Sequence, residues 1–172
     1  MLLLSFRMGE DRYALDASSV VEITPLVQLR KIPQSPEQIA GVFNYRGTPI
    51  PILDLAYIIQ GRACNTHLST RIILFKHKTS DQKLHIVGFM AEQVTETIKR
   101  SMKNFINPGV LVENAPYLQA VSNEAEGMIQ LINLSKLMSE TTENSLFNEQ
   151  NAGSDFFDED SLLSTNDDLS SS

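Results

Sequence analysis

The chain has 172 residues, of which 42% are hydrophobic, and its formal net charge is −7. This length is typical of a single domain with one core or two small ones. No apolar window of 18 residues and no secretion signal occurs, so we expect a soluble cytoplasmic protein. The single cysteine, Cys64, excludes an intramolecular disulfide.

The charge is unevenly distributed. Residues 140–172 contain nine acidic residues and no Lys or Arg, which leaves 14 basic and 12 acidic residues in positions 1–139. That first part is nearly neutral, which favours neither nucleic acid nor a membrane surface as its partner. Residues 140–172 contain too few apolar side chains to bury the surface that would offset the conformational entropy lost on ordering. We therefore expect a disordered acidic tail. Within it, Phe156 and Phe157 lie between acidic residues and form a candidate docking motif for a partner.

The chain begins with two predicted strands. Residues 2–8 form an apolar run that ends at a polar turn, and residues 12–15 form the returning strand. The next segment, 20–23, alternates in a way that separates two faces. We expect Val21 and Ile23 to point into the core, which places Val20 and Glu22 together on the opposite face.

A hairpin is the central feature of the next stretch. A serine and a proline at positions 35 and 36 predict a short helix that precedes Gly41. Two β-prone runs, 42–45 and 48–53, then flank only Arg46 and Gly47. A two-residue connection that ends in glycine is typical of a tight β-hairpin, so Arg46 is predicted to lie at an exposed tip.

The second half of the chain repeats the pattern of the first. Asp54 is expected to cap a helix over residues 55–60, and the segment 131–137 repeats the pattern of residues 52–58. Residues 71–76 and 94–96 likewise match 3–7 and 20–22, with offsets that drift from 69 to 79 residues. This degenerate repeat predicts about five short strands per half. We expect a first barrel over roughly 1–65, a polar linker at 62–70 and a second barrel over roughly 70–139.

Several of these segments, in this order, carry a family resemblance. They are Tyr13-Ala14-Leu15, Val20-Val21-Glu22-Ile23, Ile39 to Gly47 with its Asn-x-Arg-Gly turn, Pro49 to Leu55, Val87 to Val94 and Gly127 to Leu137. Together they closely resemble the CheW family of chemotaxis coupling proteins over residues 1 to about 139. The resemblance implies a mainly β fold of two five-stranded SH3-like β-barrels with few short helices. It also implies a scaffold without catalysis that joins the cytoplasmic tip of a chemoreceptor to the regulatory domain of a CheA-type histidine kinase.

The resemblance also implies a receptor-binding site. Residues Val20, Glu22, Gly41 and Arg46 match family positions linked to receptor coupling, and Asn44 and Gly47 belong to the same motif. We expect the two glycines to permit turns more than to make contacts. The sequence departs from the family at Tyr45, where relatives more often have an aliphatic residue, and in the long acidic tail.

Two other classes of protein are disfavoured. The histidines at 67, 77 and 85 lack metal-ligand spacing, and no phosphate-binding or nucleophile motif occurs, so we expect no enzyme, metal or cofactor. Binding of nucleic acid by a small barrel would need a basic groove with interleaved aromatic residues. The nearly neutral first part of the chain and an aromatic content of 7% do not favour such a groove. For an adaptor of this kind there are two alternatives: it serves swimming chemotaxis, or it serves a surface-sensing, type IV pilus or cyclic-dinucleotide pathway.

Overall fold

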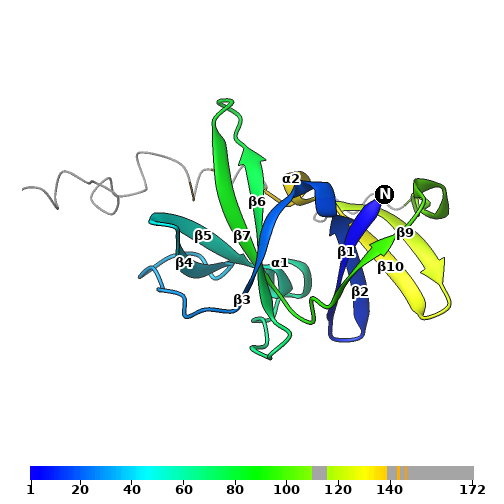
Figure 1. Cartoon of the computed structure of the whole chain (residues 1–172), viewed down its shortest axis with the longest axis horizontal. Coiled ribbons are helices and arrows are strands. Elements are labelled where there is room, and N and C mark those ends of the chain that lie inside the picture. The colour runs from blue at the N-terminus through cyan, green and yellow to red at the C-terminus, as the bar shows by residue number, and fades with distance from the viewer. Residues whose placement is uncertain (110–115, 139–142, 144–145, 147–172) are drawn as a thin grey trace, which may run out of the picture. The chain divides into compact units, whose positions relative to one another are not determined.

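A computed structural model describes residues 1–109 and 116–138 together with residues 143 and 146 (Figure 1). Tight polar turns separate most of its strands, and two short α-helices follow buried strand ends. The predicted tail and its Phe156–Phe157 motif lie outside these described residues. In chain order the elements are β1 (Leu2–Met8), β2 (Asp11–Asp16), η1 (Ala17–Ser19), β3 (Val20–Pro25), β4 (Ile39–Tyr45), β5 (Thr48–Asp54), α1 (Leu55–Gln60), β6 (Arg71–Lys78), β7 (Leu84–Ala91), β8 (Glu96–Lys99), η2 (Met102–Asn104), β9 (Leu118–Glu124), β10 (Gly127–Ile132) and α2 (Leu134–Leu137).

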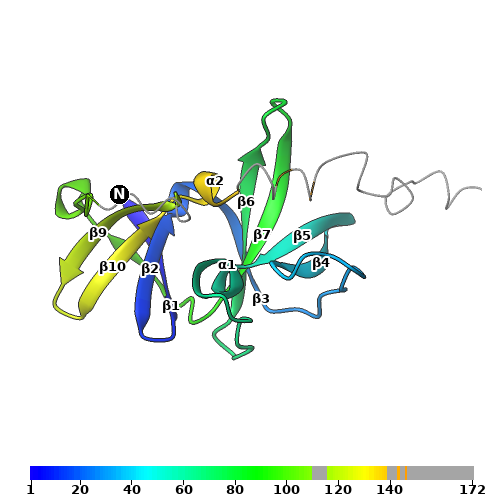
Figure 2. The same cartoon turned by 180° about the vertical axis from the view of Figure 1, so that it is seen from behind.

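The described strands form two five-stranded sheets, which confirms the predicted mainly β fold with few helices. Sheet 1 has the order β8-β1-β2-β10-β9, and sheet 2 has the order β3-β6-β7-β5-β4 (Figures 1 and 2). Neighbouring strands are antiparallel except for two parallel pairs, β10 with β2 and β5 with β7. No helix in the described part of the chain is long and apolar enough to cross a membrane.

The two halves of the chain exchange strands. Five strands and a helix, β1–β5 and α1, are followed by the same series, β6–β10 and α2, as the internal repeat predicts. The predicted division into a barrel over 1–65 and another over 70–139 is wrong, however. Sheet 1 joins β1 and β2 to strands β8–β10, whereas sheet 2 joins β6 and β7 to strands β3–β5. A local repeat in the sequence cannot reveal this, because strand pairing between distant segments is set by tertiary packing.

The registers of the two sheets are equivalent as well. In the parallel pairs, Ile52 lies opposite Gly88, and Leu131 lies opposite Ala14. The helices that follow β5 and β10 begin in the same way. The Oδ1 atom of Asp54 accepts the backbone N–H of Tyr57 at 3.0 Å, and Oδ1 of Asn133 accepts that of Lys136 at 3.2 Å. Both predicted caps are therefore present.

Two local predictions fail. Residues 35–38 form turns and no helix: the Ser35 hydroxyl donates back to the carbonyl of Ile32 at 2.8 Å, and the chain enters β4 immediately afterwards. In β3 the predicted faces are wrong, because Val21 and Ile23 are each 40% exposed. The reason is that β3 is an edge strand of sheet 2 whose pairing with β6 is irregular between Val20 and Glu22. The alternation itself is kept, so that Val20 and Glu22 form the half-buried face and Val21 and Ile23 the exposed one.

Sheet 2 is closely packed around a glycine. The rings of Phe75 and Phe89 stack with centroids 4.8 Å apart. Beside them, a Cβ atom added to Gly88 would lie 2.3 Å from Cδ1 of Ile52 and 3.1 Å from a methyl group of Ile72. Interiors packed at this density leave no room for an added methyl group. Side chains of β5 and β6 therefore fill the space above Gly88.

The connection between α1 and β6 is anchored by a buried carboxylate. Glu92, whose side chain is 2% exposed, accepts two hydrogen bonds from Arg62, at 2.6 and 3.1 Å, and one from the backbone of Asn65 at 2.7 Å. Burial alone would raise the pKa of Glu92, but the hydrogen bonds from Arg62 and Asn65 outweigh it and hold the pKa below the ordinary value. The polar linker predicted at 62–70 is thus a fixed part of the fold.

Candidate functional site

The predicted hairpin positions its arginine at the surface. Strands β4 and β5 are joined by a two-residue turn, with Tyr45 paired to Thr48. Arg46 and Gly47 both have positive φ angles, 51° and 84°, as a type I′ turn requires. The Asn44 side chain accepts the backbone N–H of Gly47 at 3.0 Å and closes the turn. The predicted hairpin is confirmed, and the side chain of Arg46 is 78% exposed.

Glu22 reaches this turn from the other edge of sheet 2. Its Oε2 atom accepts a hydrogen bond from the Tyr45 hydroxyl and lies 3.6 Å from Nη2 of Arg46. The guanidinium carbon of Arg46 lies 5.1 Å from the centre of the Tyr45 ring, a cation–π distance. We call Glu22, Tyr45 and Arg46 the tip cluster. It presents one carboxylate and one guanidinium next to each other on an exposed surface.

The hydrogen bond to Glu22, and burial to a lesser degree, raise the pKa of the Tyr45 hydroxyl. The hydroxyl is therefore protonated at neutral pH and acts as the donor to the carboxylate. Within the part of the chain that the structure describes, Tyr45 and Arg46 both contact Oε2 of Glu22, which leaves Oε1 available for other contacts. The arrangement is suited to recognition through charge and hydrogen bonds.

The remaining predicted site residues are placed differently. Val20 is half-buried two residues before Glu22 and lies opposite Phe75 of β6. Gly41 is buried four residues before the end of β4 and is not part of the tip cluster. Its φ of +152° favours glycine, and an added Cβ would lie 2.7 Å from the carbonyl oxygen of Arg30. Arg30 pairs there with Val42 through two backbone hydrogen bonds of 2.8 and 3.1 Å.

A Gly41→Ala variant should therefore lose stability rather than a partner contact. The new methyl group would push the Arg30 segment away from β4 in a backbone conformation that alanine disfavours, which we expect to cost about 2 kcal/mol. Urea denaturation measures this loss. The folded variant should bind partners like the wild type, and unchanged stability with lost binding would contradict the structural role.

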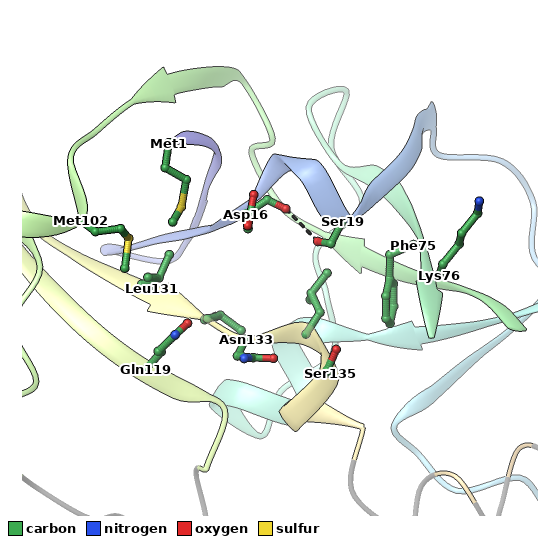
Figure 3. A pocket seen from close by; sticks show the side chains of 12 residues that line it. Met1, Asp16, Ser19, Phe75, Lys76, Met102, Gln119, Leu131, Asn133 and Ser135 are labelled. Carbon is green, nitrogen blue, oxygen red and sulfur yellow. Dashed lines mark hydrogen bonds between the residues drawn. The ribbon is translucent and has the colours of Figure 1, made fainter. Parts of the chain in front are cut away.

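A cavity of about 270 Å³ lies elsewhere in the domain, and none of the predicted site residues lines it (Figure 3). Two of its polar side chains already serve the fold: Asp16 accepts the backbone N–H of Ser18, and Asn133 caps α2. Within the described residues, no group of three or more His, Cys, Asp or Glu side chains is arranged to hold a metal ion. The tip cluster is therefore the better candidate site.

Sequence reasoning did not find the contact between Tyr45 and Glu22. The two residues are 23 positions apart and lie on strands that are not neighbours in the sheet. The exposed tip alone indicated a site, whereas its aromatic member required the tertiary structure.

Comparison with known proteins identifies the family. A model of the CheW-like domain matches residues 2–142. The chain is 23% identical over 136 residues to a chemotaxis protein CheW of Helicobacter pylori, covering 78% of this chain and 79% of that protein. It is 26% identical over 144 residues to one of Treponema pallidum, covering 80% and 81%, and 27% identical over 139 residues to the protein FrzA of Myxococcus xanthus, covering 77% and 82%.

A solved structure agrees with this similarity. The crystal structure of the scaffolding protein TtCheW from Thermoanaerobacter tengcongensis superposes with a TM-score of 0.68 at 26% identity, covering 82% of this chain and 89% of that one. With the family model spanning most of its length, the chain belongs to the CheW family.

Proposed function

We propose that this protein is an adaptor that couples chemoreceptors to a CheA-type histidine kinase. Proteins of the CheW family are non-enzymatic scaffolds of chemotaxis signalling, which agrees with the prediction that the chain is not an enzyme. The observation that carries the proposal is the tip cluster, where the exposed Arg46 of the β4–β5 turn and the carboxylate of Glu22 on β3 lie side by side. In this role the protein works in the cytoplasm and is recruited to membrane receptor arrays.

The proposed receptor site consists of Val20, Glu22 and Arg46, with Asn44 and Gly47 forming the turn that carries Arg46. The predicted site residue Gly41 lies farther back in β4 and contributes backbone conformation only. A receptor tip is a helical structure, and its rim charges would meet Glu22 and Arg46. Opposite charges at the rim of an interface guide association and fix the register, while nearby apolar groups supply contact area. Val21 and Ile23, the chain neighbours of Glu22 on the same edge strand, are exposed and offer apolar surface on the other face of β3.

The direct test is binding. The full chain should co-purify with a soluble cytoplasmic fragment of a chemoreceptor and, separately, with the regulatory domain of a CheA-type kinase. Failure to bind either one would contradict the proposed function.

An Arg46→Glu variant should weaken receptor binding at least about tenfold. The substitution replaces the guanidinium by a second carboxylate beside Glu22, so a partner surface matched to the wild-type charges meets repulsion. Titration with a labelled receptor fragment measures the dissociation constant. A Lys103→Glu variant, which makes the same charge change at exposed η2, is the control and should bind like the wild type. Equal affinity of both variants would refute the site.

A further inference from the structure

Tyr45 is the residue that links the two charges of the tip cluster. Its hydroxyl donates to Oε2 of Glu22, and its ring lies against the guanidinium of Arg46 with 5.1 Å between the guanidinium carbon and the ring centre. The Phe43 ring, two residues earlier on β4, lies 6.1 Å from the Tyr45 ring and supports it from the strand side. One aromatic side chain thus restrains both a carboxylate and a guanidinium.

The same residue also joins the two edges of sheet 2. Glu22 lies on β3 and Tyr45 on β4, which are the first and last strands in the sheet order. Sheet 1 contains an equivalent link. Glu124, the last residue of β9, corresponds to Tyr45 at the end of β4, and it pairs with Arg100, which follows the edge strand β8. A polar contact therefore links the two edges of each sheet, although Arg100 follows β8 and does not occupy the position that corresponds to Glu22.

The two links differ in their exposure. In sheet 1 the side chain of Glu124 is 16% exposed and pairs with the buried Arg12 at 3.4 Å as well as with Arg100. In sheet 2 the side chains of Glu22 and Arg46 are 39% and 78% exposed. The carboxylate of Glu124 in sheet 1 is thus mostly buried and is already paired with two arginines of the same chain. The link in sheet 2 leaves its charges accessible to another molecule.

Restraint of exposed charges has a consequence for binding. Long polar side chains lose rotamer freedom when an interface orders them, and this loss reduces affinity. Side chains that are already held in place in the free protein lose less. If Tyr45 holds Glu22 and Arg46 in the orientation that a partner meets, these two side chains lose less rotamer entropy on binding.

We propose that Tyr45 is a positioning residue that preorganises Glu22 and Arg46 for partner binding. This inference rests on the proposed function of the tip cluster as a receptor site. It also defines the chemistry of the partner surface: an acceptor, such as a carboxylate, meets Arg46, and a hydrogen-bond donor meets the oxygen Oε1 of Glu22. Tyr45 itself need not touch the partner.

Two variants separate the parts of this role. Tyr45→Phe keeps the ring against Arg46 but removes the hydrogen bond to Glu22, and Tyr45→Leu removes both. We expect the dissociation constant for a soluble receptor fragment to rise about threefold for Tyr45→Phe and about tenfold for Tyr45→Leu. Thermal unfolding of each variant, measured in parallel, shows how much of the effect is a loss of fold. Binding to the kinase regulatory domain, measured on the same preparations, is the matched control and should not change.

A double-mutant cycle tests whether Tyr45 acts through Glu22. In a Glu22→Gln background the charged acceptor is gone, so adding Tyr45→Phe should change receptor affinity by less than the threefold effect seen in the wild type. An equal effect in both backgrounds would mean that Tyr45 contacts the partner directly, and this would overturn the positioning role. If the wild type binds receptor and both Tyr45 variants bind equally well, the inference fails while the proposed function stands. If the wild type binds no receptor fragment, both fail.

Discussion

A Gly88→Val variant should be about 3–4 kcal/mol less stable than the wild type. Gly88 lies in β7, paired with Ile52 of β5 on one side and Leu74 of β6 on the other. The side chains of Ile52, Ile72 and Leu74 are fully buried and already occupy the space above its Cα atom. The branched side chain of valine would force several strands apart. Urea denaturation should show a lower midpoint with an unchanged slope.

A smaller pair of substitutions tests the cause. Ile52→Val removes Cδ1, the atom that lies 2.3 Å from the position of a Cβ at residue 88. The destabilisation by Gly88→Ala should therefore be smaller in the Ile52→Val background than in the wild type, by about 1 kcal/mol. Strictly additive effects would show that crowding by Ile52 is not the reason for glycine at this position.

An Arg62→Met variant should lose about 3 kcal/mol of stability at pH 7, the lower end of the range for a broken buried ion pair. The lower end applies because the Arg62 side chain is 36% exposed, whereas Glu92 is 2% exposed and would remain as an unpaired buried charge. The methionine keeps most of the apolar stem, so the loss reports mainly on charge. Adding Glu92→Gln should recover part of the stability, since it removes that charge and keeps an acceptor for Asn65.

The effect of Arg62→Met should also depend on pH. The pKa of Glu92 in the folded wild type lies below the ordinary value of 4.5, so its ionised form stabilises the fold above that pH. This contribution is lost as the pH falls through the folded-state pKa. In the variant, burial without the guanidinium raises the pKa of Glu92, so acid protonates it and relieves its charge. The stability difference between the wild type and the variant should therefore shrink as the pH falls through the raised pKa of the variant, above 4.5, and go on shrinking until the pH is below the lowered pKa of the wild type. A constant difference from pH 7 down to pH 3 would contradict this account.

Features that are encoded by neighbouring residues were predictable. Arg46 and Gly47 formed the expected turn because two adjacent positive φ angles leave few alternatives. Asp54 capped α1 as expected because its side chain acts within the first helical turn. The predicted helix before Gly41 failed although its capping residues were present, since four residues that lead directly into a strand cannot complete a helix.

Features that depend on distant segments were not predictable in the same way. The alternation of residues 20–23 indicated two faces correctly, but which face is buried depended on the position of β3 at a sheet edge. The tip cluster was half predicted: the exposure of Arg46 follows from the local turn, whereas its contact with Glu22 requires that β3 and β4 approach each other. The anchor formed by Arg62 and Glu92, 30 residues apart, had no signal in the sequence.

The exchange of strands between the two halves has a consequence for synthesis on the ribosome. The hairpin β1–β2 is made first, yet its neighbours in sheet 1 are β8 and β10, and β10 ends only at Ile132. At about 5–20 residues per second, the hairpin waits several seconds with both edges unpaired. Unpaired edges are the sites at which nascent chains join other chains. Solubility of the newly made protein should thus depend on how quickly its last strands are translated, and rare codons placed before residue 118 should favour aggregation.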